Sequence, residues 1–503
     1  MLFTSEQHGM WDTWIYPHDG KYYLFWLQDK YRANVLPHKI VWDSIALAVS
    51  EDLLHWKEIG TVIEKAPDAD NWMGTGRTWK VRNKFYMNFS EYRQNIQSIY
   101  FAESDDLITW KRLDHEYRFD IDDRWYVSKL EETPEPWVRW DCLCPVRKAD
   151  GSYVGFFSSH SKHKPIGARA VVGAATSSDG VNWIASQPAS DRSEPSAEVS
   201  GYVCFEDRHY VTISNTEAWG PRYDNGQSRN GMWYWVSDNL EGPYGPPKHD
   251  HFLHGQRASD FSAYFGTAFK DGDKWLWNHH WNDTEGILWL GTIKELKEEA
   301  PGRLALYYWD GNENLKGECV IDSNYNLIPH YPPAYPERPV CASWNVKDGV
   351  LTGSTERASG LAVIEVPQSV EQGCIISCDI NIGKNNGDGA GLFIGGTKEL
   401  NATGIAILLN PEGKALLGKT IMGFTSPRLM YWEDFDIDIF IDRKVHILAI
   451  VKKDFVEIYA NNKLLRTLSM SKDQCFDGKF GLWIDRCSAS MDNLKVWNIV
   501  DLS

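Results

Sequence analysis

The sequence predicts an all-β protein, a five-bladed β-propeller followed by a C-terminal β-sandwich. Short runs of aromatic and β-branched residues bounded by Asp-Gly turns indicate many strands. A motif that recurs four times in the first half of the chain indicates repeated blades. A proline-rich segment marks a change of pattern, and 503 residues exceed what one ordinary core holds.

The strand signals come first. Residues 21–26 and 153–157 are typical strand sequences, rich in Tyr, Phe and Val. Asp-Gly pairs at 19–20, 150–151 and 271–272 predict hairpin turns. The one segment that suggests a helix is short, residues 293–299.

The repeat has the form Ser-x-Asp-x-x-x-Trp. Its copies begin at Ser50, Ser104 and Ser177, with a weaker copy at Ser237, so they lie 54, 73 and 60 residues apart. Such periods suit four-stranded propeller blades, and a fifth unit spans about residues 260–293. We expect the motif to be structural, because Ser and Asp cap turns and Trp packs between blades.

These patterns define three regions. We expect the propeller over residues 1–328, a semi-rigid linker with five prolines over 329–340, and the sandwich over 341–503.

The composition of the chain excludes several classes of binding partner. A net charge of −17 disfavours nucleic acid and anionic membrane surfaces as partners, so we expect a small or neutral ligand. The sequence contains no apolar run long enough for a bilayer and no signal peptide at its start. Nine irregularly spaced cysteines predict free thiols and a cytoplasmic location, while the oligomeric state stays open.

Four acidic residues stand early in the blades, where the first strands surround a central funnel. They are Asp12 in blade one, Asp141 in blade three, Glu198 in blade four and Asp260 in blade five. A carboxylate within an aromatic strand sequence indicates a partner or a function, because burying an unpaired charge is costly. Glu194 competes with Glu198, but Pro195 favours a loop there.

Paired carboxylates predict glycoside cleavage. One carboxylate acts as nucleophile or base and the other as acid, and a third binds ring hydroxyls. Surplus Trp residues would wall the sugar pocket. His279 and His280 are adjacent on a strand and face opposite sides, so a metal site is disfavoured and one of them would line the funnel. The pair Cys142 and Cys144 lacks a second metal-type pair.

These positions resemble the β-fructosidase clan, glycoside hydrolase families 32 and 68, within the superfamily that also holds families 43 and 62. The family's Trp-Met-Asn-Asp-Pro, Arg-Asp-Pro and Glu-Cys motifs correspond to Trp11-Asp12-Thr13-Trp14, Arg139-Trp140-Asp141 and Glu198-Val199. Residues 260–264 and 72–76 resemble its Asp-Phe-Tyr-Ala segment and its blade-two segment beside the sugar. The motifs depart from the family in an inserted Trp140, in Val199 for Cys, and in lacking Pro.

The resemblance implies a divergent retaining enzyme that acts on fructofuranosides or small fructo-oligosaccharides. Asp12 would attack the anomeric carbon, Glu198 would be the acid/base, Asp141 would bind ring hydroxyls, and no metal or cofactor would be required. The implied substrate contacts are Trp11, Trp14, Trp72, Arg139, Asp260, Tyr264 and Trp281. Three alternatives remain: an inverting arabinofuranosidase or xylosidase of the family 43 type, a fructotransferase acting on fructose dianhydrides, and a sugar-binding propeller without catalysis.

Overall fold

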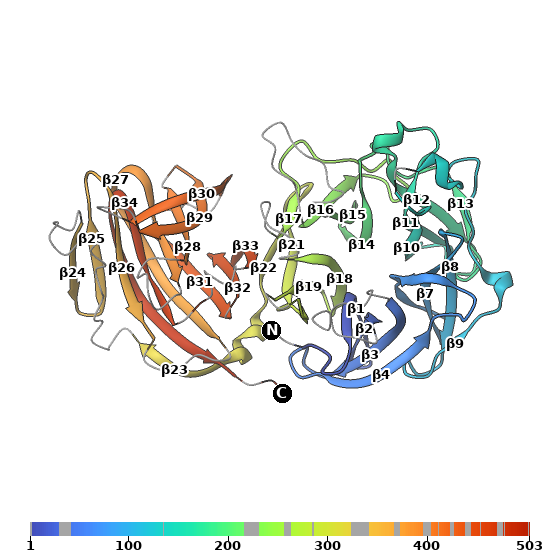
Figure 1. Cartoon of the computed structure of the whole chain (residues 1–503), viewed down its shortest axis with the longest axis horizontal. Coiled ribbons are helices and arrows are strands. Elements are labelled where there is room, and N and C mark those ends of the chain that lie inside the picture. The colour runs from blue at the N-terminus through green and yellow to red at the C-terminus, as the bar shows by residue number, and fades with distance from the viewer. Residues whose placement is uncertain are drawn as a thin grey trace. The chain divides into compact units, whose positions relative to one another are not determined.

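The structure is a computed structural model, and it is described in two compact units, Met1–Trp309 with Leu502–Ser503, and Asp310–Asp501 (Figure 1). The described residues are 3–29, 42–133, 135–215, 231–255, 263–283, 286–322, 342–366, 373–395, 404–410, 412–422, 427–437, 444–452, 454–469, 476, 478–500 and 502. The division falls at residue 309, whereas we expected the first domain to end at 328. The predicted linker, 329–340, lies outside the described residues.

The first unit is built from antiparallel sheets that follow one another along the chain. The first sheet contains β1 (Gly9–His18), β2 (Lys21–Asp29), β3 (Trp42–Ser50) and β4 (Lys57–Glu64). The second contains β5 (Asp70–Gly74), β6 (Thr78–Val81), β7 (Lys84–Arg93), β8 (Ile96–Ser104) and β9 (Lys111–Arg112). The third contains β10 (Trp140–Arg147), β11 (Tyr153–His160), β12 (Ala170–Ser177) and β13 (Ile184–Ser186). The fourth contains β14 (Glu198–Phe205), β15 (Arg208–Asn215), β16 (Gly231–Ser237) and β17 (Phe252–His254).

A further antiparallel group follows these four sheets. It contains β18 (Tyr264–Asp271), β19 (Lys274–Asn282), β20 (Leu288–Leu290), β21 (Lys294–Ala300) and β22 (Arg303–Tyr308). It is not a separate sheet, so our prediction of five separate blades is wrong and four are present in the described residues. The group is irregular because β19 pairs with the short β20 near one end and with β21 near the other.

The expected helix at 293–299 is also wrong, because this segment is strand β21. Tertiary pairing explains the difference. Lys294, Glu295 and Leu296 pair with β19 on one side, and the strand pairs with β22 on the other. Two ladders therefore override a weak local preference for helix.

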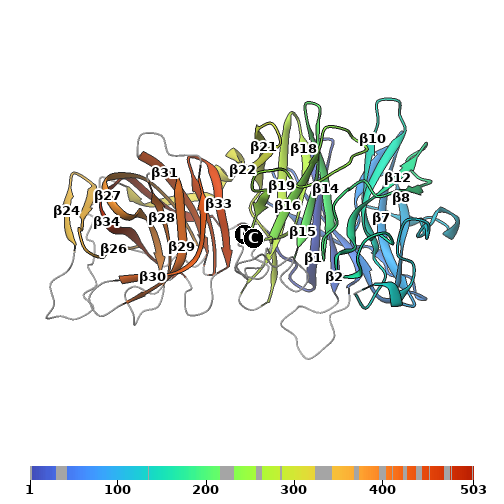
Figure 2. The same cartoon turned by 90° about the horizontal axis from the view of Figure 1, so that it is seen from above.

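The inner strands of the first unit make a propeller-like arrangement. Strand β1 contacts β18, β18 contacts β14, β14 contacts β10, and β10 contacts β7. Figure 1 shows these strands around a common centre, and Figure 2 shows them side by side from the edge. Apolar clusters fill the space between successive sheets: Phe25 and Met87 join the first and second, Phe101 and Phe157 the second and third. Burying such side chains between sheets is the main stabilising contribution.

The repeated Ser-x-Asp motif forms the turn between the third and fourth strands of three sheets. In its first copy the Ser50 hydroxyl accepts from the backbone N–H of Leu53, and one oxygen of Asp52 accepts from the N–H groups of Leu54 and His55. The indole of Trp56 donates to the carbonyl of Leu53. The structural interpretation of the motif is confirmed, because its polar groups are used within the turn.

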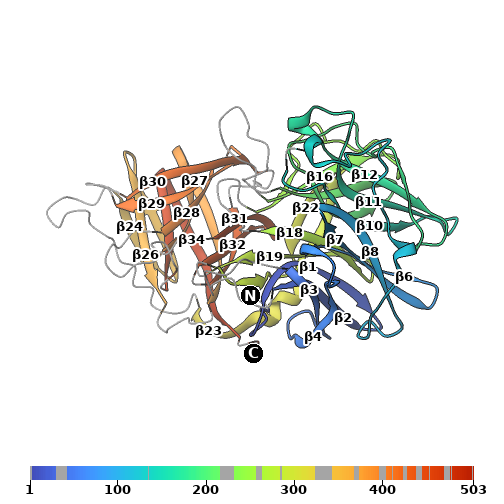
Figure 3. The same cartoon turned by 45° about the vertical axis from the view of Figure 1, so that its right-hand side comes forward.

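The second unit is also all-β in its described residues. Its strands are β23 (Lys316–Asp322), β24 (Ser343–Lys347), β25 (Val350–Ser354), β26 (Ser359–Glu365), β27 (Cys374–Gly395), β28 (Gly404–Asn410), β29 (Lys414–Met422), β30 (Pro427–Asp436), β31 (Lys444–Lys452), β32 (Phe455–Ala460), β33 (Lys463–Ser469) and β34 (Lys479–Ile499). The long strands β27 and β34 pair with each other and run side by side (Figures 1 and 3). One large apolar cluster, which includes Leu351, Ile376, Ile447 and Leu482, is its core.

Helices are few and short. The described residues contain four 3-10 helices: His115–Tyr117, Leu130–Glu132, Ile166–Ala168 and Asp310–Leu315. Within the described part of the chain, no helix has the length and hydropathy needed to cross a membrane. The seven described cysteines are all free thiols.

Candidate active site

A register shift recurs where each inner strand of the first unit begins. The shifts lie between Trp11/Thr13 in β1, Asp70/Met73 in β5, Asp141/Cys144 in β10, Val199/Gly201 in β14 and Tyr264/Thr267 in β18. Such a bulge leaves a residue out of the ladder and redirects its side chain. The predicted acids Asp12, Asp141 and Glu198 all lie at or within one residue of these bulges.

Asp12 is the extra residue of its bulge. It has a positive φ of 43° and is 3% exposed, so the strand holds it in an uncommon conformation and buries it. The hydroxyl of Thr75 donates to its Oδ2. Its Oδ1 is buried and accepts no hydrogen bond from the protein among the described residues. One carboxylate oxygen is therefore fixed and the other is left for a ligand.

Asp141 is held in a similar way from the third sheet. It is 5% exposed, and the amide of Gln97 donates to its Oδ2 over 3.0 Å. Gln97 also donates to Ser90 Oγ over 3.1 Å and accepts from the backbone N–H of Trp140 over 3.0 Å. These three bonds leave Gln97 no freedom to rotate, so the orientation of Asp141 is fixed.

Glu198 heads strand β14, and its side chain is 14% exposed. The phenol of Tyr264 donates to Oε2, and the thiol of Cys142 lies 3.9 Å from Oε1. Glu198 thus receives contacts from the third sheet and from strand β18.

Arg139 joins the acids. Its NH1 lies 3.4 Å from Glu198 Oε1 and 3.7 Å from Asp141 Oδ2, and its Nε lies 3.4 Å from Glu135 Oε2. Its side chain is 7% exposed. One buried cation among three carboxylates neutralises only part of their charge, so the cluster has a negative excess.

The pKa values reflect this excess. Burial, followed by the charge of Glu198, raises the pKa of Asp12 well above its usual value, and the hydrogen bond from Thr75 opposes the rise. Burial raises the pKa of Asp141 to about 6, against the lowering effect of Arg139. Burial and the charge of Glu198 also raise the pKa of Tyr264 well above its usual value, so this phenol stays a donor. Perturbed, coupled carboxyls of this kind are typical of active sites.

Aromatic side chains border the cluster. The ring of Trp11 lies 5.5 Å from Tyr264 and 4.9 Å from His280, measured between centroids. Trp72 packs edge to face on Tyr92 and Trp137, at 5.3 and 5.6 Å.

Two other predicted contacts are placed differently. Trp14 is 2% exposed, donates to Thr78 Oγ1 over 3.1 Å and packs on Phe25 in the core between the first and second sheets. It is therefore not brought to the carboxylates. Trp281 is buried in β19, next to His280. Asp260 lies outside the described residues.

The structure adds Arg77, Gln97 and Glu135, which the sequence analysis missed, and gives a contact to Thr75, which it had marked only within the segment 72–76. Thr75 and Arg77 lie where the inner strand of the second sheet is interrupted, between β5 and β6. Arg77 has one buried guanidinium nitrogen that makes no hydrogen bond with the described residues, and its charge acts on Asp12 and Glu198. Gln97 donates to Asp141, and Glu135 pairs with Arg139. Their only signal was polarity within apolar segments, which many structural residues share.

Asp141, Cys142 and Glu198 each offer a ligand atom, all within 4.8 Å of one another. The guanidinium of Arg139 already pairs with both carboxylates, so a metal cation would have to displace it. This donor set fits an arginine-bridged carboxylate pair better than a metal.

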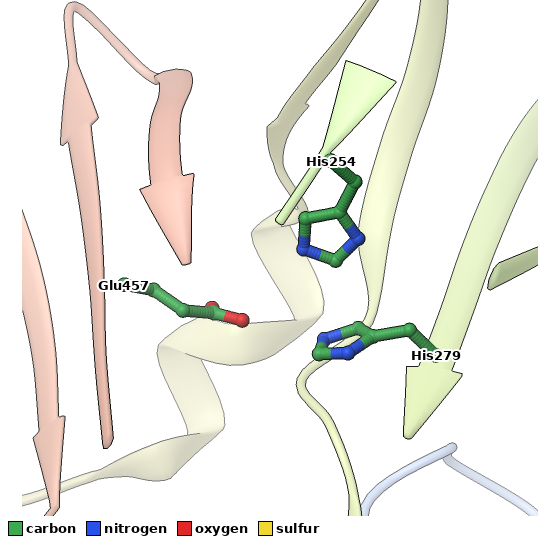
Figure 4. A group of neighbouring side chains, drawn as sticks. All are labelled: His254, His279 and Glu457. Carbon is green, nitrogen blue, oxygen red and sulfur yellow. The ribbon is translucent and has the colours of Figure 1, made fainter. Parts of the chain in front are cut away.

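His279 and His280 face opposite sides of β19, as the strand period requires. The ring of His279 lies edge to face on that of His254, with centroids 4.3 Å apart (Figure 4), and its Nε2 accepts from the ammonium of Lys294 over 3.0 Å. His280 packs instead on Tyr264, 5.7 Å away. Of the two, His280 is the one beside the carboxylate cluster.

Solved structures with this fold are glycoside hydrolases. Sucrose-6-phosphate hydrolase from Lactobacillus gasseri is 14% identical, with a TM-score of 0.68 over 98% of this chain and 92% of that one. Fructan 1-exohydrolase IIa from Cichorium intybus is 13% identical, with a TM-score of 0.67 over 99% and 96%. Exo-inulinase from Aspergillus awamori is 13% identical, with a TM-score of 0.66 over 100% and 98%.

The fold is thus that of the glycoside hydrolase family 32 β-fructofuranosidases, as the sequence motifs predicted; a further similar structure, from Bombyx mori, carries that family name. No model of a protein family matches the chain, and no curated protein sequence is similar to it.

Proposed function

We propose that the chain is a retaining glycoside hydrolase that acts on fructofuranosides or small fructo-oligosaccharides. The observation that carries the proposal is the convergence of Asp12, Asp141 and Glu198 from the inner strands of three sheets, with Arg139 paired to the last two. The names of the similar structures, which include an inulinase and a fructan exohydrolase, support a fructoside substrate.

Asp12 is the proposed nucleophile. Its Oδ2 is held by Thr75, so Oδ1 is left to attack the anomeric carbon. As the bond from this carbon to Oδ1 forms, the bond from the same carbon to the leaving oxygen breaks. Asp12 must be ionised for this step; the bond from Thr75 favours the ionised form, while burial and the charge of Glu198 oppose it.

Glu198 is the proposed acid/base. It gives its proton to the leaving oxygen, then takes a proton from water as that water attacks the anomeric carbon and releases Asp12. The mechanism requires the proton on Glu198 and an ionised Asp12 when the substrate is bound. Tyr264 and Arg139 hold the carboxyl in position.

Asp141 and Arg139 are the proposed substrate-orienting pair. The Oδ1 of Asp141 is buried and accepts no hydrogen bond from the described residues, so it is available for a ring hydroxyl. A carboxylate there also stabilises the positive charge that develops on the sugar. Arg139 would bind a substrate oxygen from the opposite side.

We infer one finer feature of the fold. The second unit is a β-sandwich, which is supported by its large apolar core and its antiparallel ladders.

Product analysis tests the proposal. Sucrose, inulin- and levan-type oligosaccharides, fructose dianhydrides and an aryl arabinofuranoside are incubated with the protein and with Glu198→Gln. Free fructose that the variant does not release supports the proposal, and the anomer first released, read by NMR in a methanol-containing buffer, must retain the substrate's configuration. An inverted anomer, release of arabinose alone, or no reaction with any fructoside would overturn it.

A further inference from the structure

A groove lies over four neighbouring strands of the second unit, β24, β25, β34 and β27. Its volume is about 710 Å³. The polar side chains that define it are Asn345, Thr352, Ser354, Asn381, Ser488 and Ser490. This volume lies in the range of about 300–1,000 Å³ that small-molecule sites occupy.

The register places these side chains on one face of the sheet. Thr352 pairs with Asn345 and Ser490, and Ser490 pairs with Asn381, so four strands contribute one polar row. Ser354 and Ser488 form part of a second row two residues along. Because side chains alternate along a strand, both rows point to the same side.

The intervening residues point the other way. Leu351, Ile382 and Ala489 are at most 6% exposed and belong to the core of the unit. Asn345, Thr352 and Ser354, by contrast, are exposed. The groove therefore lies on the sheet face that is turned away from the core.

The lining carries no charge. None of the twelve lining residues is Asp, Glu, Lys or Arg, in a chain of which 24% of residues are charged. Exposed sheet faces commonly carry long charged side chains, so a groove lined by Ser, Thr and Asn differs from the usual composition of such a face. Such a lining does not suit phosphates, metal cations or nucleic acid, which require charged partners.

Some of these polar groups are held in place. The amide of Asn381 donates to Asp492 Oδ2 over 2.9 Å, and this fixes where its carbonyl oxygen points. The hydroxyl of Thr352 donates to the backbone carbonyl of Asn345 over 3.2 Å, so its lone pairs can accept. The ring of Trp344 does not face the groove, because Trp344 alternates with Asn345 along β24 and packs against the core of the unit. Neutral hydroxyl and amide groups, held in one row, complement the hydroxyl groups of a sugar.

We propose that this groove is a second carbohydrate site, which binds a neutral oligosaccharide independently of the carboxylates of the first unit. Small side chains let a sugar ring approach the sheet, and matched neutral polarity favours it over charged ligands. The proposal goes beyond the proposed function and does not depend on it.

An oligosaccharide array tests the site. The full chain carrying Glu198→Gln, which blocks turnover, is applied to neutral and acidic oligosaccharides, alone and with Thr352→Lys or Ser354→Lys. Met430→Lys is the control, because Met430 is exposed on β30, away from the groove lining. Unchanged circular dichroism and melting temperature establish that each variant is folded.

We expect the array to retain some neutral oligosaccharides. Their retention should fall at least tenfold with either groove variant and should stay unchanged with the control. Retention that neither groove variant alters, no retention at all, or groove-dependent retention of acidic oligosaccharides only would overturn the proposal. Thr352→Lys without Glu198→Gln should leave the rate on small soluble substrates unchanged. This rate tests the proposed hydrolysis separately from binding at the groove.

Discussion

The first unit uses aspartate in two contrasting environments. At the turns, Asp52 and Asp179 accept several hydrogen bonds from nearby N–H groups, which outweigh desolvation and lower the pKa of each to about 2. At the inner strands, Asp12 and Asp141 are buried with few donors, and desolvation raises the pKa of both.

The contrast separates a structural acid from a functional one. A turn aspartate has its oxygens occupied by its own loop, so it has no capacity left for a ligand. Asp12 and Asp141 each keep one buried oxygen that accepts no hydrogen bond from the described residues, at a cost in stability. Such a cost is expected where a ligand supplies the missing partner.

The largest expected effect comes from replacing the two proposed catalytic acids. Asp12→Asn and Glu198→Gln should each lower kcat on a fructoside by about 10⁴-fold, roughly 5 kcal/mol, because nucleophile and acid/base act in the reacting step. Asn tolerates the positive φ of residue 12, so the protein should stay folded. Steady-state kinetics and thermal melts check this, with Asp106→Asn as the control, because Asp106 is the turn aspartate of the motif copy that begins at Ser104. Near-normal rates would contradict the assignment of either residue.

The pH dependence of stability sharpens the contrast. The pKa of Asp141 is raised from 3.8 to about 6, so the folded state holds this proton more tightly than the unfolded chain. Its contribution to the free energy of unfolding is therefore present below about pH 4 and lost as pH rises to about 6, on the order of 3 kcal/mol. Melting temperatures between pH 4 and 7 should fall less steeply for Asp141→Asn than for the wild type. Equal slopes would show that Asp141 does not carry the raised pKa.

Gln97 tests whether the support of Asp141 matters. Gln97→Ala removes the amide that stabilises the ionised carboxyl, so the pKa of Asp141 should rise further and the acid limb of the kcat/KM profile should move to higher pH. We expect a loss of about 10- to 100-fold at pH 6 that shrinks at higher pH. Gln97→Glu, which keeps the shape and adds charge, should be worse at every pH. A pH-independent loss would indicate a purely structural role.

The smallest expected effect comes from replacing a turn aspartate. Asp52→Ala removes an acceptor of two backbone N–H groups and should cost about 1 kcal/mol of stability with no change in kcat. Denaturant unfolding and kinetics measure both quantities. A lower kcat at unchanged stability would mean that the motif has a function beyond the turn.

The fold was largely predictable because its signals are local. Asp-Gly turns, alternating strands and the repeated Ser-x-Asp turn each depend on a few consecutive residues, and they form as expected. The segment 293–299 was misassigned because pairing with β19 and β22 outweighs its local preference. The number of separate sheets was misjudged because strand pairing between distant segments is not visible in a period.

The candidate site was predictable in part. Asp12, Asp141 and Glu198 stood out as acids at the starts of strands, and Arg139 as their neighbour in sequence. Gln97 did not, because 44 residues separate it from Asp141, and Thr75 stood out only as part of the segment 72–76, since 63 residues separate it from Asp12. Trp14 looked equivalent to Trp11, yet it packs into the core, while Trp11 lies nearer the start of the strand and contacts Tyr264 and His280.

The sequence by itself determined the strands, their turns and the acidic residues at the inner strand starts, since each depends on local backbone preference and polarity. The tertiary structure alone decided which acids meet, which oxygens stay unpaired and which pKa values rise. The reason is physical: desolvation and charge coupling depend on groups from distant segments, and these have no order until the sheets pack.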